Sequence, residues 1–328
     1  QDQCSTIDFD EELESRIEER VETGGTDGRL MQGSEGTPYR VNLFEKLMVP
    51  VLSKLSNLVP GGGIWMNTQR PEWNDANNAL AGGGVSVVTL GYLRRHLAFL
   101  AGRLESAAEH TLPVSSEVVE WFDALEKVFE GRRALAQKSD VSSEDRRQMM
   151  DALGQAFSAY RTKVYDGGFT GRAELSVRRA IALCRTALEF VDADLERNRR
   201  PDGLFHTYNR LDPTSDGMEL KRLPVMLEGQ VSVLSSGFLD PEQSVDLVRT
   251  LFASELYHEG HRSFLLYPEK QLPGFMDRNV VPEARAREVG LLSELLDRGE
   301  GSLVAVDVDG TCRFDGDIGS AEDVAQVL

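Results

Sequence analysis

Apolar residues recur along most of this chain with the spacing of α-helices. The segment 85–104 shows the pattern best, because its leucines return every three or four residues and therefore share one helical face. These leucines are Leu90, Leu93, Leu97, Leu100 and Leu104. The same period predicts further helices, which lie at 9–21, 41–58, 115–136, 142–164, 171–199, 223–234, 240–256 and 281–299. Pro50 falls inside one of them and should kink it.

Long helical patterns with few strand patterns between them indicate a mainly α fold. A solenoid of repeated helix pairs should show a fixed period of roughly 34 to 47 residues, and the sequence shows no such repeat. A closed toroid of paired helices needs no repeat, so we expect a toroid. Its long polar loops, at 59–84, 200–222 and 257–280, would line one mouth.

The pattern changes after residue 300. An apolar run from Val304 to Asp307, an Asp309-Gly310 turn and a second run to Phe314 predict a β-hairpin. The same stretch, from Asp307 to Thr311, resembles the first motif of the haloacid-dehalogenase phosphotransferases, in which the first Asp is the nucleophile. That family needs a long α/β domain after the motif, and only 17 residues follow Thr311, so we favour the hairpin.

We expect three parts in this chain. A helical and linker segment occupies 1–39, the helical toroid occupies 40–300, and 301–328 holds the hairpin and the start of a further segment. The chain begins without a methionine and ends just after a new helix start at Ser320. We therefore expect a fragment of a longer protein and an incomplete toroid.

Composition narrows the possible partners. The chain has 54 Asp and Glu residues against 36 Lys and Arg residues, a formal net charge of −18. Such a surface repels nucleic acids and anionic membranes, and no apolar run is long enough to span a membrane. Cys4, Cys184 and Cys312 are too few and too scattered for a disulfide framework. They fit a cytoplasmic location; the oligomeric state stays open.

The richest chemistry lies in a polar loop at 70–80. It combines two carboxylates, three carboxamides, a guanidinium and an indole between two glycine runs. An indole can stack on the C–H face of a sugar, and the polar groups can bind its hydroxyls. Asp75 is the candidate general acid, with Glu72 as the alternative. The candidate substrate-binding residues here are Arg70, Glu72, Trp73, Asn74 and Asn77. The alternative is a polar loop that Trp73 anchors to the core.

A second carboxylate stands alone in an apolar stretch. Glu228 is the only charge between Leu223 and Leu239, so it must find a partner, a cavity or a raised pKa. We take it as the second catalytic candidate, with Gln230 beside it as a substrate-binding residue. The alternative is an exposed Glu, or one paired with Arg222.

Two histidine-containing stretches carry further hypotheses. His206 and Tyr208 lie in a mixed polar strip that could bind substrate, or that could simply be held by its own side chains. His258 and His261 are three residues apart, whereas the metalloprotease helix places its two histidines four apart. We expect no metal site there.

Three pieces of this sequence resemble a known group of enzymes. They are 70–80 around Trp73-Asn74-Asp75, then 223–229, then 253–257. Together, over roughly 40–300, they resemble the six-hairpin (α/α)6-toroid glycosidases and glycoside phosphorylases, in particular large bacterial proteins similar to cellobiose phosphorylase. In that family a Trp-Asn-Asp loop supplies the general acid, which implies this role for Asp75. The family's loop typically continues Gly-Met, whereas Ala76-Asn77 follow here, so hydrolysis and phosphorolysis both stay open.

The resulting prediction is an inverting enzyme that cleaves a glycosidic bond of an oligosaccharide. It needs no cofactor, although a phosphorylase would use inorganic phosphate as co-substrate. The cations available for that phosphate are Arg70, Arg94, Arg95 and Arg210. The alternative is a non-catalytic helical protein that binds carbohydrate or acts as a scaffold. A third possibility, the phosphotransferase, would depend on Asp307 and magnesium.

Overall fold

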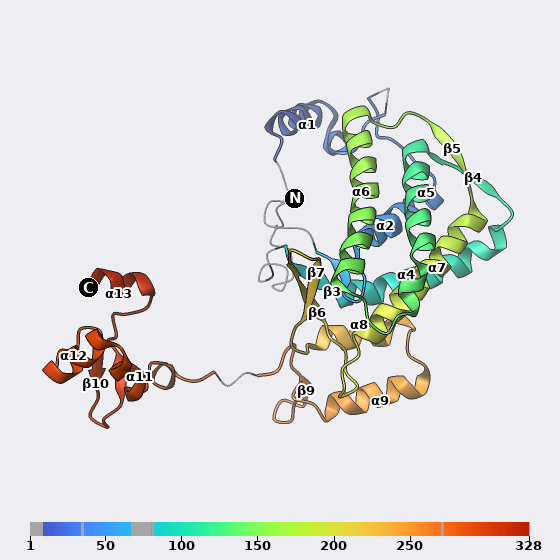
Figure 1. Ribbon diagram of the computed structural model, residues 1–328. Coiled ribbons are helices and arrows are strands. Elements are labelled where there is room, and N and C mark those ends of the chain that lie inside the picture. Colours follow the sequence, from blue (N-terminus) through green and yellow to red (C-terminus); the bar gives the residue numbers. More distant parts are fainter. Residues whose placement is uncertain (1–8, 34–35, 67–79, 81, 270–271, 328) are drawn as a thin grey trace. The chain divides into compact units, whose positions relative to one another are not determined.

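The computed structural model describes residues 9–33, 36–66, 80, 82–269 and 272–327. The chain divides into two units, Gln1–Pro268 and Glu269–Leu328. Helices dominate the described residues, and the first unit adds a five-stranded antiparallel sheet (Figure 1). The mainly helical class predicted from the sequence is therefore confirmed.

The helices of the first unit follow the predicted apolar periods. They are α1 (Glu11–Gly24), α2 (Leu43–Ser56), α4 (Val87–Leu104), α5 (Ser116–Gly131), α6 (Ser143–Gly167), α7 (Val177–Arg197), α8 (Leu227–Ser236) and α9 (Pro241–Phe252). The leucine face of α4 is buried, and this helix packs against both α7 and α8. Phe129 of α5 meets Phe190 of α7 edge to face, with ring centroids 5.1 Å apart. These contacts place one large apolar core between the helices.

The sheet runs in the order β1-β2-β3-β6-β7, and every neighbouring pair is antiparallel. Its strands are β1 (Leu58–Val59), β2 (Gly63–Trp65), β3 (Gly84–Ser86), β6 (Tyr208–Pro213) and β7 (Met218–Arg222). The sequence pattern predicted loops over 59–84 and 200–222, so that prediction was wrong where the strands lie. The strands in 59–84 have only two or three residues and are too short to show an alternating pattern. The sheet nevertheless brings these two segments together, because β3 pairs with β6.

The predicted start of one helix was wrong, because a strand of a separate two-stranded ribbon occupies its first residues. Strand β4 (Thr111–Ser115) pairs with β5 (Arg172–Ser176), and each leads directly into a helix, α5 and α7. The sequence pattern predicted that the second of these helices begins at residue 171, whereas α7 begins at Val177, six residues later. The described residues do not show a closed ring of paired helices, so the toroid stays a prediction.

The second unit is small and has its own core. It contains α10 (Phe275–Arg278), α11 (Glu283–Glu288), α12 (Gly290–Arg298), β10 (Val304–Val306), β11 (Cys312–Phe314) and α13 (Ala321–Val327). Leu303, Val304 and Cys312 are buried at its centre. The predicted helix at 281–299 is broken, because Val289 takes an extended conformation between α11 and α12.

The predicted C-terminal hairpin is confirmed. Strands β10 and β11 are antiparallel, and Oδ1 of Asp307 accepts hydrogen bonds from the backbone N–H groups of Asp309 and Thr311. Gly310 has a φ of 80°, a value that glycine adopts without strain. The Asp307 carboxylate therefore serves the turn, and it also pairs with Arg313.

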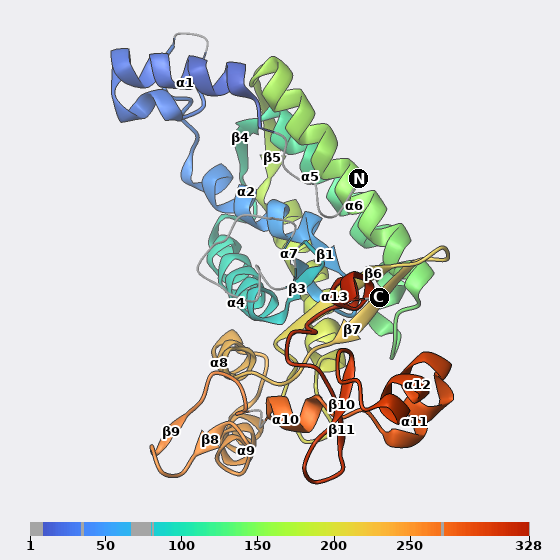
Figure 2. The same cartoon turned by 90° about the vertical axis from the view of Figure 1, so that its left-hand side faces the viewer.

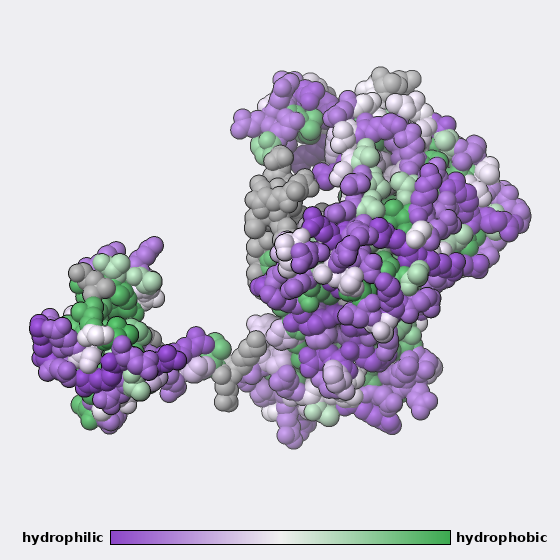
Figure 3. Space-filling view, in the orientation of Figure 1, coloured by the Kyte–Doolittle hydropathy of each residue, from purple (hydrophilic) through white to green (hydrophobic). Residues whose placement is uncertain are grey.

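Hydrophilic residues cover most of the face seen in Figure 3. None of the helices in the described part of the chain is long and apolar enough to cross a membrane.

Candidate functional site

The loop that carries the predicted general acid begins and ends at neighbouring strands. The candidates Asp75, Arg70, Glu72, Trp73, Asn74 and Asn77 lie outside the described residues. On either side of them, β2 ends at Trp65 and β3 begins at Gly84. Trp65 Nε1 donates to the Gly82 carbonyl over 2.7 Å, and the Met66 N–H donates to the Gly84 carbonyl over 2.8 Å. These hydrogen bonds hold together the residues on the two sides of the segment that carries Asp75.

Glycine is required where β2 approaches β3. Gly63 has a φ of 132°, and a Cβ atom there would lie 2.6 Å from the Ser86 carbonyl oxygen. A Cβ atom on Gly84 would lie 2.7 Å from Cε of Met66. At Gly63 a larger residue would clash with the backbone of β3, so glycine permits the close approach of the two strands there.

The other four candidate residues gather where β6 meets the start of α8. These residues are His206, Tyr208, Glu228 and Gln230. The Tyr208 hydroxyl donates to Oε2 of Glu228 over 2.6 Å. Two segments separated by 20 residues in the sequence therefore place a phenol and a carboxylate in direct contact.

Glycine again allows this approach. A Cβ atom on Gly229 would lie only 2.4 Å from Oγ1 of Thr207. In the actual structure, Oγ1 of Thr207 donates to the Met226 carbonyl over 3.0 Å and accepts from the Gly229 N–H over 3.2 Å. The first turn of α8 is thereby fixed against the segment that leads into β6.

Glu228 has the partner that its apolar surroundings require. It is the second residue of α8, where the partial positive charge of a helix N-terminus favours a carboxylate. Its side chain is half-buried, and the hydrogen bond from Tyr208 satisfies one of its oxygens. Arg222, the alternative partner, donates instead to Oδ1 of Asn198 and to the Arg197 carbonyl.

Gln230 and His206 are held by backbone groups. The fully buried Gln230 side chain accepts from the Phe205 N–H over 2.8 Å and donates to the Phe205 and Met226 carbonyls. Nδ1 of His206 lies 3.0 Å from the Leu223 carbonyl oxygen. Burial lowers the pKa of His206 below its ordinary value, which favours the neutral imidazole. These contacts position the segment, and substrate binding by either residue stays a prediction.

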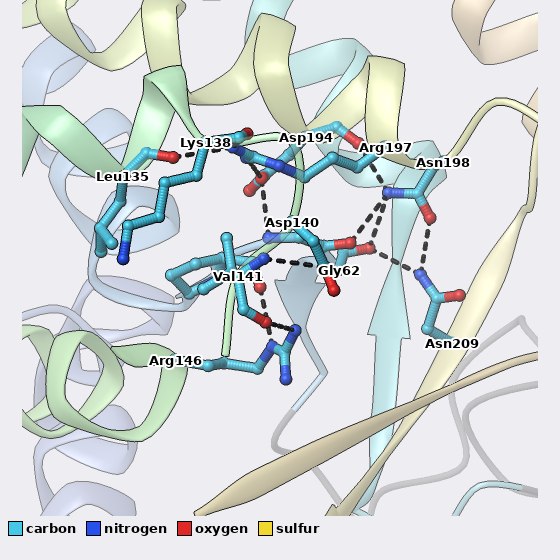
Figure 4. A network of polar contacts seen from close by, with 12 residues as sticks. Gly62, Leu135, Lys138, Asp140, Val141, Arg146, Asp194, Arg197, Asn198 and Asn209 are labelled. Atoms are coloured by element: carbon cyan, nitrogen blue, oxygen red, sulfur yellow. Dashed lines mark hydrogen bonds and ion pairs between the residues drawn. The ribbon is translucent and has the colours of Figure 1, made fainter. Parts of the chain in front are cut away.

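A buried polar network around the β1–β2 turn was not predicted from the sequence (Figure 4). Oδ1 of Asp194 on α7 accepts from the Gly61 N–H over 2.7 Å and from Nη1 of Arg197 over 2.6 Å. Nδ2 of Asn209 on β6 donates to the Gly62 carbonyl over 2.7 Å and to Oδ1 of Asn198 over 2.9 Å. The network therefore ties the β1–β2 turn to both α7 and β6.

Asp194 is the unusual member of this network. Its side chain is about 1% exposed, and burial raises its pKa to about 6 although the adjacent Arg197 opposes the shift. A sequence signal did exist, since Asp194 falls on the apolar face of α7, three and four residues after Val191 and Phe190. A carboxylate at such a position has to be paired.

Two of the four arginines considered for phosphate already have carboxylate partners. Arg94 pairs with Asp192 and also donates to the Ser236 carbonyl, and Arg210 pairs with Asp212. Arg95 is exposed on α4.

The two histidines near the end of the first unit do not form a metal site with other residues in the described part of the chain. Nδ1 of His258 accepts from the His261 N–H. Among the residues that the structure describes, no group of three or more His, Cys, Asp or Glu side chains could hold a metal ion.

The sequence of the second unit carries the family relationship. Residues 272–328 match the family model described as GH149 phosphorylase insertion domain 2. This segment is related to GH149 phosphorylases. The match spans nearly the whole compact unit that begins at Glu269, and it places the chain in the context of carbohydrate-active enzymes. No curated protein sequence matches the chain.

Proposed function

We propose that this chain belongs to a glycoside phosphorylase that cleaves a glycosidic bond with inversion, and that Asp75 is its general acid. The observation that carries the proposal is the match of residues 272–328 to a GH149 phosphorylase insertion domain. The same chain holds the Trp73-Asn74-Asp75 motif, which resembles the general-acid loop of the toroidal phosphorylases. The (α/α)6 toroid is part of this proposal.

The chemistry needs one protein acid. Asp75 donates a proton to the glycosidic oxygen as its bond to the anomeric carbon breaks. Inorganic phosphate attacks that carbon from the opposite face, so the products are a sugar 1-phosphate and a shortened oligosaccharide. Phosphate is itself the nucleophile, and no second carboxylate has to activate water. An inverting hydrolase, by contrast, needs a base roughly 6.5 to 9.5 Å from the acid.

Glu228 distinguishes these two reactions. In a hydrolase it would be the base that activates water. In a phosphorylase it is a positioning residue, a role supported by its hydrogen bond to Tyr208 at the start of α8. Glu228→Gln should therefore leave most phosphorolysis intact, whereas it should abolish hydrolysis.

The test uses the protein with whatever flanking sequence its gene encodes. Phosphate release is measured from a panel of sugar 1-phosphates with oligosaccharide acceptors, for the wild type and for Asp75→Asn. We expect the substitution to lower kcat at least about 100-fold, the usual range for loss of a general acid, and to leave KM for the acceptor nearly unchanged.

Glu72→Gln is the matched control, because it removes the other carboxylate of the same loop. Full activity of Asp75→Asn, together with loss of activity in Glu72→Gln, would transfer the role to Glu72. A wild type that binds oligosaccharide but turns over none of the panel, with binding unchanged in Asp75→Asn, would favour the non-catalytic carbohydrate-binding protein.

A further inference from the structure

A cavity of about 660 Å³ lies in the first unit, between α1, α2 and α6. Figures 1 and 2 show α1 beside the C-terminal end of α6, and Figure 3 shows the surface hollowed between them. Leu13 and Ile17 of α1 line one wall, and Val164 of α6 lines the opposite wall. The volume lies within the range of about 300 to 1,000 Å³ that is usual for small-molecule sites.

The walls of this cavity are positively charged in a chain whose net charge is −18. The four arginines among its lining residues are Arg16, Arg20, Arg29 and Arg161. Within the described ranges, no Asp or Glu lines the cavity, and none of these four guanidinium groups has a carboxylate partner. By contrast, Arg147 and Lys163, which lie on the same helix α6 but outside the cavity, pair with carboxylates.

One of the four arginines has an unsatisfied donor. Nε of Arg20 is buried, and it has no hydrogen-bond partner among the residues that the structure describes. A buried donor without an acceptor is costly. An anion in the cavity would supply acceptors for this arginine and for its three neighbours.

Flat side chains line the same cavity. Phe157 and Tyr160 stack on Trp121, with ring centroids 4.9 and 4.3 Å from the indole. The guanidinium carbon of Arg161 lies 5.7 Å from the centroid of the Phe157 ring and 5.9 Å from that of Tyr165. Tyr165 is 68% exposed. The cavity therefore offers planar surfaces next to cationic groups.

We propose that this cavity binds a small organic anion that joins a phosphate group to a planar ring, the chemistry of a mononucleotide. Guanidinium groups bind phosphate oxygens through paired N–H donors, and an aromatic base stacks on tyrosine and phenylalanine rings. A neutral oligosaccharide suits these walls less well, because its hydroxyls require acceptors as well as donors. The site shares no residue with the predicted catalytic loop, so the proposal is independent of the proposed function.

Calorimetric titration of the full chain with AMP tests this proposal. Adenosine lacks the phosphate and inorganic phosphate lacks the ring, so these two probes separate the two halves of the ligand. We expect AMP to bind at least about tenfold more tightly than either, and its affinity to fall as salt screens the arginines. Equal affinity for AMP and adenosine, or no binding of AMP, would overturn the proposal.

Substitutions locate the site. Arg161→Met and Arg16→Met remove exposed cations from the cavity, and each should weaken AMP binding about tenfold, the usual effect of losing a charge-assisted hydrogen bond. Arg147→Met is the matched control, because it removes an arginine from the same helix α6 outside the cavity. If Arg147→Met weakened binding as much as Arg161→Met, binding would be non-specific and the cavity would not be the site. Circular dichroism of each variant checks that α6 still folds.

Discussion

The buried Tyr208 hydroxyl donates a 2.6 Å hydrogen bond to the carboxylate of Glu228. Tyr208 is the first residue of β6, and Glu228 lies in the first turn of α8. The bond therefore ties the sheet to a helix that also packs on α4. The bond also gives a hydrogen-bond donor to Oε2 of Glu228, the only charged residue in an apolar stretch.

Loss of this donor should destabilise the fold. We expect Tyr208→Phe to lower the free energy of unfolding by about 1 to 3 kcal/mol, because the half-buried Glu228 carboxylate then loses its partner. Glu228→Gln should cost less, since its amide oxygen still accepts the bond. Urea denaturation followed by circular dichroism measures both. Tyr92→Phe, on the exposed face of α4, is the control and should change stability by less than about 0.5 kcal/mol.

Asp194 should make stability depend on pH. Burial raises its pKa from the ordinary value of 3.8 to about 6 in the folded protein. Between these values the folded state binds more protons than the unfolded state, so the free energy of unfolding falls as pH rises from about 4 to about 6 and is level above. Each unit of pKa shift corresponds to about 1.4 kcal/mol.

Asp194→Asn isolates this effect, because asparagine does not titrate but still accepts from the Gly61 N–H. We expect the stability difference between the wild type and the variant to move in favour of the variant as pH rises from 4 to 6, by up to about 3 kcal/mol. Urea denaturation of both proteins at several pH values measures it. A difference that stayed constant with pH would contradict this prediction, because it would show that the Arg197 pairing cancels the effect of burial and leaves the pKa of Asp194 unshifted.

The contact between α4 and α8 depends on Gly91. A Cβ atom there would lie 2.2 Å from Oγ of Ser232 and 3.2 Å from its carbonyl oxygen. Gly91→Ala should therefore push the helices apart and destabilise the protein by about 1 to 3 kcal/mol, the usual cost of overpacking.

Gly102 provides the control for this prediction on the same helix. A Cβ atom on Gly102 would have nothing within 4 Å. Gly102→Ala should leave stability unchanged or raise it by up to about 1 kcal/mol, because alanine favours the helix. Thermal denaturation measures both variants. Equal decreases in the melting temperatures of Gly91→Ala and Gly102→Ala would contradict the prediction.

The sequence predicted the features whose causes are local. The leucine period of α4 predicts a buried face, because residues three and four apart share one side of a helix. The helix predicted at 240–256 begins where expected, since Asp240 caps α9 with a full capping box. The Asp-Gly pair at 309–310 predicted the C-terminal hairpin. In each case the decisive residues lie within a few positions of one another.

The sheet and the buried network could not be predicted from local sequence patterns, because their hydrogen bonds join residues far apart in the sequence. Strands β1, β2 and β3 have two or three residues each, and β3 joins them to the remote strand β6, where Gly84 pairs with Arg210. The bond from the Gly61 N–H to Asp194 spans 133 positions of the sequence, and the bond from Asn209 to Gly62 spans 147.

In the candidate site, too, local features were predictable from the sequence and long-range contacts were not. The sequence by itself identified Glu228 as a lone carboxylate that needs a partner, because an unpaired charge in an apolar stretch is costly. Only the tertiary structure decided that the partner is Tyr208 rather than Arg222, since helix packing against the sheet determines which side chain lies within hydrogen-bonding distance.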